Sequence, residues 1–103
     1  MESIDYLAAL KNYLDITYDD PDTDAKLTGI CRRAEEYLRK AAGYRISFSA
    51  EMDDQAALQL LFDCVRYIRS NALEEFADNF AGELWALRAL YHVERMREDE
   101  LYA

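Results

Sequence analysis

The most apolar helical pattern in the chain runs from Leu58 to Phe76. If this stretch is placed on a helix at about 100° per residue, its polar residues fall on one narrow strip, and apolar residues occupy most of the remaining circumference. We therefore expect a central helix that other helices of this chain cover in part and other copies of the protein cover in another part. The polar strip comprises Gln59, Asp63, Arg66 and Ser70, and the apolar remainder comprises Leu58, Leu60, Leu61, Phe62, Cys64, Val65, Tyr67 and Ile68.

Apolar residues with helical spacing predict further helices on both sides of this stretch. Asn71 and Glu74 have the spacing of a capping box, so a short helix should begin there, and Gly82 should mark the next break. The expected helices are Ile4 to Leu14 with Ser3 as its cap, about Thr23 or Asp24 to Ala42 with Gly43 as its end, Asp53 to about Arg69, a short helix with Leu73, Phe76, Ala77 and Phe80, and Glu83 to about Arg97.

One segment, Tyr44 to Ser49, alternates apolar and polar residues as an extended chain with one buried side does. No second stretch alternates in this way, so we favour a loop that lies over the helices, and pairing with another subunit is the alternative. The predicted fold class is therefore all-α, a small bundle of four to five helices with a central apolar helix and an extended loop or short strand around residues 44–49.

The composition agrees with a single domain over residues 1–103, because 51% of the residues are hydrophobic, 32% are charged, three are Gly and one is Pro. The formal net charge of −9 argues against direct binding to nucleic acid or anionic lipid, which this surface would repel. No apolar run is long enough to cross a bilayer, and residues 1–3 lack the features of a signal peptide. We expect a cytosolic protein without a membrane partner.

The acidic segment from Asp15 to Asp24 is the best candidate for a metal site. Asp20, Asp22 and Asp24 have the first three spacings of a calcium loop, but the Gly position holds Ala25 and the closing Glu position holds Cys31. We therefore expect no metal, and expect these acids to solvate the loop and face the positive end of the next helix. On that helix, the pairs Glu35 with Arg39 and Glu36 with Lys40 predict a solvent or rim surface.

Parts for catalysis are few. His92 has no second His or Cys at ligand spacing, and the sequence has no Gly-rich phosphate loop, nucleophile elbow or CxxC pair. Cys31 and Cys64 fall on apolar helix faces, where we expect buried thiols. We therefore expect no enzyme activity and no cofactor. A small hydrolase or nuclease that uses the Asp15–Asp24 acids with a divalent metal is kept as an alternative hypothesis.

The last predicted helix carries two apolar stripes on nearly opposite faces, and one small chain can hardly bury both. We expect the second stripe to be a protein interface, with Asp63 and Arg66 of the central polar strip as further interface candidates. The polar tail, residues 98–103, is expected to be disordered until a partner binds it. The first stripe is Phe80, Leu84, Leu87 and Tyr91, and the second is Trp85, Ala89, His92, Val93 and Met96.

The chain also resembles a known family. The stretch LLFDCVRYIRSNALEEF, followed by NFAGELWALRALY, looks like the small head–tail connector proteins of tailed phages, which are neck or adaptor proteins associated with DNA packaging. The opening LKNYLDITYDDPDTDAKLTGICRRAEEYLRKAAG is similar to the beginning of the same family, where a short helix and an acidic loop lead into an AEEYL-type helix. The two regions together cover nearly the whole chain.

The resemblance implies a helical structural subunit that assembles as a ring, commonly of twelve copies, beneath the portal of a filled capsid. Such a ring extends the channel through which DNA passes without specific binding, and it presents a platform for neck or tail proteins. The region from Trp85 to Ala103 would engage the portal. The protein would then occupy the host cytoplasm during assembly and the virion neck afterwards, or the bacterial cytoplasm if a prophage encodes it. The alternative is a cytosolic helical module that binds one protein partner through its C-terminal helix.

Overall fold

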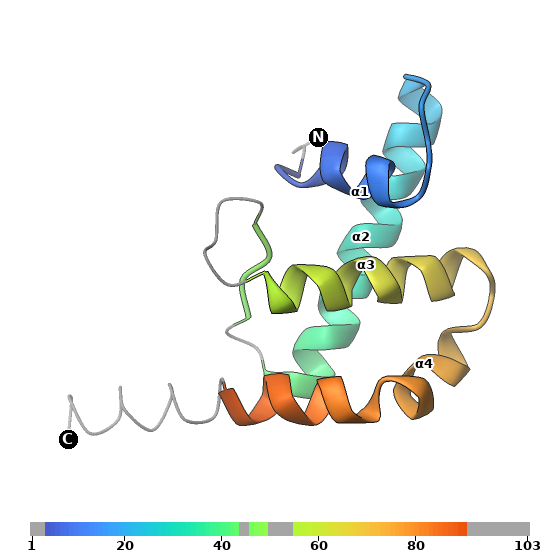
Figure 1. Cartoon of the computed structure of the whole chain (residues 1–103). Coiled ribbons are helices and arrows are strands. Elements are labelled where there is room, and N and C mark those ends of the chain that lie inside the picture. The colour runs from blue at the N-terminus through green and yellow to red at the C-terminus, as the bar shows by residue number, and fades with distance from the viewer. Residues whose placement is uncertain (1–3, 44–45, 50–54, 91–103) are drawn as a thin grey trace.

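The computed structural model describes residues 4–43, 46–49 and 55–90, and Figure 1 shows their arrangement. Within these ranges the chain forms helices and no strand, so the predicted all-α fold class is confirmed. The helices are α1 (Leu7–Tyr13), α2 (Pro21–Ala42), α3 (Ala56–Arg69), α4 (Leu73–Asn79) and a further helical segment over residues 81–90.

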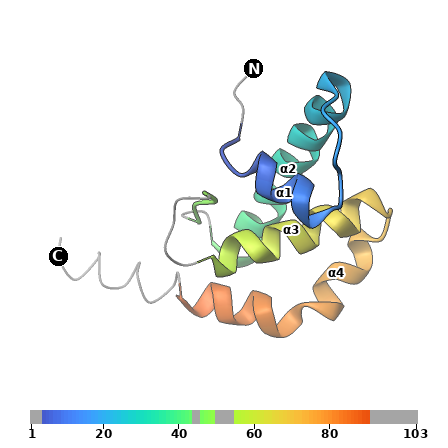
Figure 2. The same cartoon turned by 45° about the horizontal axis from the view of Figure 1, so that its top comes forward.

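The long helix α2 is the support on which the other helices lie. Figures 1 and 2 show α1, α3 and the segment 81–90 following one another along α2, with α3 across its middle. The short helix α4 turns the chain, so that the segment 81–90 runs back alongside α3. This arrangement brings the end of the described chain close to the face of α3.

The core lies where α3 crosses α2. Cys31, Ala34 and Leu38 of α2 are fully buried, as are Leu61, Cys64 and Val65 of α3. Cys and Ala at this crossing allow the two helix axes to approach closely. Both cysteines are free thiols, as the sequence predicted, and burial raises the pKa of Cys31 to about 11 and that of Cys64 to about 12.

The chain itself covers the apolar side of the central helix. Tyr67 and Ile68 are half-buried, and the other predicted apolar positions are at most 7% exposed. Gln59, Arg66 and Ser70 of the polar strip are exposed, and Asp63 is half-buried. The helices of one chain therefore cover most of this apolar side, and cover by other copies stays a prediction.

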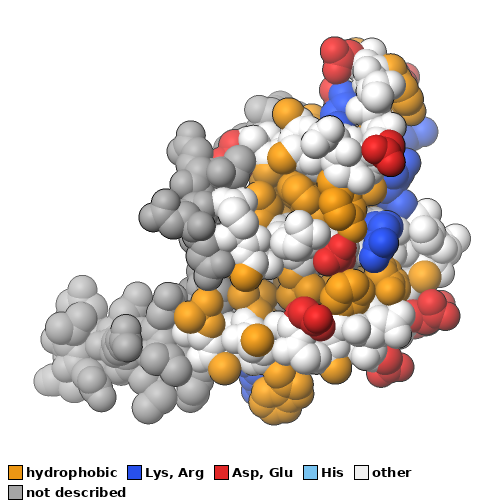
Figure 3. Space-filling model, in the orientation of Figure 1, with side chains coloured by type: hydrophobic (Ala, Val, Ile, Leu, Met, Phe, Trp, Pro, Cys, Tyr) orange, Lys and Arg blue, Asp and Glu red, His pale blue; other side chains and the backbone are white. Residues whose placement is uncertain are grey.

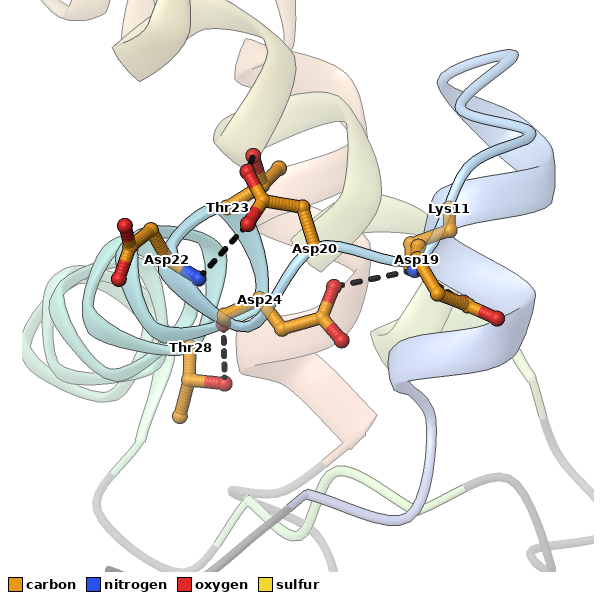
Figure 4. Close-up of polar contacts among 7 residues, drawn as sticks. All are labelled: Lys11, Asp19, Asp20, Asp22, Thr23, Asp24 and Thr28. Atoms are coloured by element: carbon orange, nitrogen blue, oxygen red, sulfur yellow. Dashed lines mark hydrogen bonds and ion pairs between the residues drawn. The ribbon is translucent and has the colours of Figure 1, made fainter.

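The start of α2 depends on one acidic side chain. The Oδ1 atom of Asp20 accepts a hydrogen bond from the Asp22 N–H at 3.3 Å, and its Oδ2 accepts one from the Thr23 hydroxyl at 2.8 Å (Figure 4). Pro21 occupies the first helical position, where a missing N–H costs nothing. The helix therefore begins at Pro21, and the predicted start at Thr23 or Asp24 is wrong. Gly43 follows the last residue of α2 as predicted.

The acidic loop is tied to α1 by a lysine. The Lys11 Nζ lies 3.0 Å from Asp19 Oδ1 and 3.0 Å from Asp24 Oδ1 (Figure 4). These two carboxylates, Asp24 first, raise the pKa of Lys11. The acids thus hold the loop to α1 and cap α2, and do not only solvate the loop. Among the described residues, no group of three or more His, Cys, Asp or Glu could hold a metal ion.

Asn71 ends α3 and does not begin α4. Its φ of 56° is left-handed, its N–H donates to the Ile68 carbonyl at 3.1 Å, and the Ala72 N–H donates to the Tyr67 carbonyl at 2.9 Å. These bonds form a Schellman motif. The predicted capping box is therefore wrong, since Ala72 is the N-cap of α4 and makes no side-chain cap bond.

Two other predicted boundaries differ from the structure. The first helix begins at Leu7 and not at Ile4, which lies buried ahead of it. Gly82 lies inside the helical segment 81–90, and the break falls two residues earlier, at Phe80. Ser3 and Asp53, the predicted first residues of two helices, lie outside the described residues.

Glu35 is the clearest departure from the predicted surface of α2. Its side chain is only 5% exposed, and its Oε2 accepts a hydrogen bond from the Tyr6 hydroxyl at 2.7 Å. Arg32 and Arg39 each place a guanidinium nitrogen 3.5 Å from its Oε1. Burial, and then the bond to Glu35, raises the pKa of Tyr6. The predicted solvent face is therefore wrong at Glu35, whereas the Glu36 and Lys40 pair is exposed as expected.

Residues 46–49 form an irregular segment over the end of α2, which agrees with the favoured loop. Ile46 is 2% exposed, and its carbonyl accepts a hydrogen bond from Arg39 Nε at 3.1 Å. The Arg39 guanidinium also lies over the Phe48 ring, 5.2 Å from its centroid. One arginine thus joins the loop to the buried Glu35.

We expect Asn71→Ala to lower the free energy of unfolding by about 1 kcal/mol, because a β-carbon without a compensating polar group disfavours the left-handed conformation. Asn71→Gly is the control and should be at least as stable as the wild type. Urea denaturation followed by circular dichroism measures both. An Ala variant as stable as the Gly variant would contradict the assignment.

We expect Tyr6→Phe to lower the free energy of unfolding by about 1 to 3 kcal/mol, because the substitution leaves a buried carboxylate oxygen of Glu35 without its donor. Tyr18→Phe is the matched control, since Tyr18 is 58% exposed. The same denaturation experiment compares the two variants, and equal stabilities would show that the Tyr6 bond contributes nothing.

Candidate protein-interaction surface

The helical segment 81–90 presents an apolar face to solvent. Leu87 is 5% exposed and packs in the core, and Leu84 is half-buried against it. On the other side of the same segment, Trp85 is 69% exposed and Ala89 is exposed. The described part of this helix therefore divides as its two stripes predicted, with one in the core and one outside.

Around Trp85 the surface is shaped by three neighbours. The Arg88 guanidinium lies over the indole ring, 5.7 Å from its centroid. A small hollow of about 140 Å³ lies between Trp85, Leu84, Arg88 and the exposed Ala41 at the end of α2. We call Trp85, Arg88 and Ala89 the Trp85 face, an exposed aromatic and aliphatic surface with one positive charge.

A larger hollow lies on the other side of the same segment. This α3 groove, with a volume of about 510 Å³, separates α3 from residues 81–90. In Figure 3 hydrophobic side chains gather along the boundary between these two elements, and acidic side chains border them. Its lining residues are Ala56, Gln59, Leu60, Asp63, Glu83, Ala86, Leu87 and Leu90.

Asp63, a predicted interface residue, lies in this groove and already has partners in its own chain. Its Oδ1 accepts a hydrogen bond from the Tyr13 hydroxyl, and the Arg66 Nη2 lies 3.9 Å from the same oxygen. Burial and this bond raise the pKa of Tyr13 to about 12. The side chain of Asp63 is 16% exposed and that of Arg66 is 53% exposed, so Arg66 is the more accessible of the two.

The predicted interface residues do not form one continuous surface. Asp63 and Arg66 lie together on α3, and Asp63 lines the α3 groove. Trp85 and Ala89 lie on the outer side of the segment 81–90. The remaining predicted residues, His92, Val93 and Met96, lie outside the described residues.

Sequence reasoning missed most of the α3 groove. Leu90 belongs to neither of the two predicted apolar stripes, and an apolar residue outside both stripes is the sequence signal of a third surface. In the structure Leu90 is 42% exposed. Ala86 carries no signal in the sequence, and the sequence predicts Leu60 only as part of the apolar face of the central helix. The groove exists because α4 turns the chain back along α3, which local periodicity does not report.

None of the helices in the described ranges is long and apolar enough to cross a membrane. No protein-family model matches the chain, and neither a curated protein nor a solved structure shows significant similarity to it.

We expect Trp85→Asp to change the free energy of unfolding by less than about 0.5 kcal/mol, because the side chain is mostly in solvent. Leu87→Asp, two residues away, should lower it by about 3 kcal/mol or more, because it buries an unpaired charge. Circular dichroism with urea titration distinguishes the two. Unfolding of the Trp85 variant would place Trp85 in the core.

Proposed function

We propose that this chain is a structural head–tail connector subunit of a tailed phage or prophage. In this role it assembles as a ring, commonly of twelve copies, beneath the portal, extends the DNA channel and offers a platform to neck or tail proteins. It acts by assembly and docking and performs no chemical reaction. It would occupy the host cytoplasm during assembly and the virion neck afterwards.

The observation that carries the proposal is the exposure of Trp85. An indole that is 69% exposed and backed by a packed helix offers a large, rigid, apolar contact. Tryptophan and arginine are the residues most enriched among those that dominate binding energy at protein interfaces, and Arg88 lies directly over this ring. A subunit that stays associated in a ring needs such an anchor.

The charge of the chain also supports the proposal. A channel for packaged DNA must not hold the phosphates, because each Lys or Arg contact with phosphate would resist sliding. A subunit with a net charge of −9 repels the duplex weakly on average. The ring would therefore guide DNA without binding it specifically.

The α3 groove favours a second candidate, a helical module that binds one protein partner in the cytosol. The described part of a single chain builds this groove, so it needs no ring in order to exist. An open apolar groove between two helices suits an amphipathic helix from another protein. In that case the gene would lack portal, terminase and capsid genes as neighbours.

The proposal predicts that purified chain adds a symmetric layer to isolated portal rings, which electron microscopy would show. Trp85→Asp should abolish this layer, because it replaces the apolar anchor with a charge. Tyr18→Asp is the matched control, since Tyr18 is also an exposed aromatic residue and lies in the acidic loop. The absence of a layer with wild-type chain at several salt concentrations would contradict the connector role.

A further inference from the structure

We propose that the α3 groove of one copy receives the Trp85 face of the next copy, so that the chain assembles head to tail. This inference rests on the proposed ring, and it names the two surfaces that form the contact. The occupant of the groove is thus a second copy of this chain.

The first argument is that the groove has room for the Trp85 face and shares its apolar character. The groove has a volume of about 510 Å³, and the two leucines Leu60 and Leu87 lie at its base. Ala86 and Ala56 on its walls have small side chains, which leave room for a helix to approach. The Trp85 face offers a helix with a protruding indole, a side chain that buries about 150 to 250 Å² in such sites.

The second argument is charge. Glu83 lines the groove, and among the described residues it makes no ion pair or hydrogen bond. Arg88 beside Trp85 contacts the indole ring but no carboxylate within the same ranges. Within the described part of one copy, the groove therefore carries an acid without a partner and the opposite surface a base without a partner, and the two charges fit each other across a contact between copies.

Asp63 adds a second negative charge to the groove, although Tyr13 and Arg66 already contact it. In Figure 3 acidic side chains lie on both sides of the hydrophobic boundary, one side belonging to α3 and the other to the segment 81–90. An incoming positive charge would thus meet acids from both walls. This arrangement disfavours an acidic helix and also disfavours a phosphate backbone.

The third argument is that a helical occupant suits this groove. Both walls of the groove are α-helices, whose backbone groups bond within each helix, so neither wall offers a free edge to pair with a strand. A helix satisfies its own backbone groups and needs no such edge. The segment 81–90 of a second copy meets this requirement and carries its apolar face outward.

The geometry of the contact then determines the type of assembly. Glu83 and Arg88 are separated by five residues, which places them about 140° apart around the helix. The groove and the Trp85 face are therefore different surfaces on opposite sides of one segment. A contact between different surfaces is heterologous and extends from copy to copy. It closes as a ring when the rotation between copies closes, as the proposed function requires, and otherwise continues as an open filament.

A mixing experiment with full-length chain tests the inference. Trp85→Asp removes the anchor, and Ala86→Arg fills the groove with a long charged side chain at an exposed position. Each variant alone should be monomeric by sedimentation. An equimolar mixture should form a dimer and nothing larger, because one intact groove and one intact Trp85 face remain. A mixture that stays monomeric, or either variant assembling like the wild type, would overturn the inference.

A charge exchange supplies an independent test. Glu83→Arg and Arg88→Glu should each weaken self-association about ten-fold or more, and the double variant should recover most of the loss. Asp78→Arg is the control, since Asp78 is exposed on α4 away from the groove, and it should have little effect. Circular dichroism checks that every variant is folded. Equal losses in the double and single variants would overturn the pairing.

Three further outcomes would also overturn the inference. The first is that wild-type chain remains monomeric at millimolar concentration and on portal rings. The second is that nuclear magnetic resonance finds residues 91–103 of the same chain in the groove. The third is that a foreign helix binds in the groove and the chain does not self-associate. If the Ala86→Arg variant still forms a layer on the portal, this inference is wrong and the connector role stands. If the chain self-associates through the groove but forms no layer on the portal, the connector role is wrong and the contact between copies stands.

Discussion

The packing of α3 across α2 is the contact on which the rest of the structure depends. The small side chains of Cys31, Ala34 and Cys64 let the two helices approach closely, and the larger Leu38 and Leu61 are fully buried beside them. Because α3 is fixed there, α4 and the segment 81–90 return along one defined side of it. The α3 groove and the Trp85 face are both consequences of that placement.

A second constraint fixes the N-terminal residues to this crossing. The buried carboxylate of Glu35 is acceptable only because Tyr6, Arg32 and Arg39 surround it with donors. Arg39 extends the same network to the carbonyl of Ile46, so one acid organises the segment before α1 and the segment after α2. A small domain thus uses a polar network to position its irregular segments, whereas its helices are positioned by apolar contacts.

The helices could be predicted because each buries one apolar stripe, and periodicity reports such stripes directly. The ends of the helices could not be predicted, because the same residue type can stand before the first turn of a helix or after its last turn. Asn71 is equally suited to an N-cap and to a left-handed position after a helix, and only the path of the chain decides between them. Glu35 was mistaken for a surface residue because its spacing to Arg39 is that of an exposed pair. For the candidate surface, the opposite stripes predicted that Trp85 would be exposed, but no local pattern relates Leu60 to Leu87.

The net charge of the chain and the charges of the segment 81–90 limit how copies could associate. Each copy carries a net charge of −9, so copies repel one another at long range. Added salt screens this repulsion at distances beyond the Debye length, which is about 10 Å at 0.1 M. Burial of Trp85 acts only at contact and depends little on salt. Moderate salt should therefore favour assembly by reducing the general repulsion, until it also screens the local attraction between Arg88 and Glu83. An anchor that is mostly apolar, with one charge pair to set its register, suits an acidic subunit whose partner is another copy of itself.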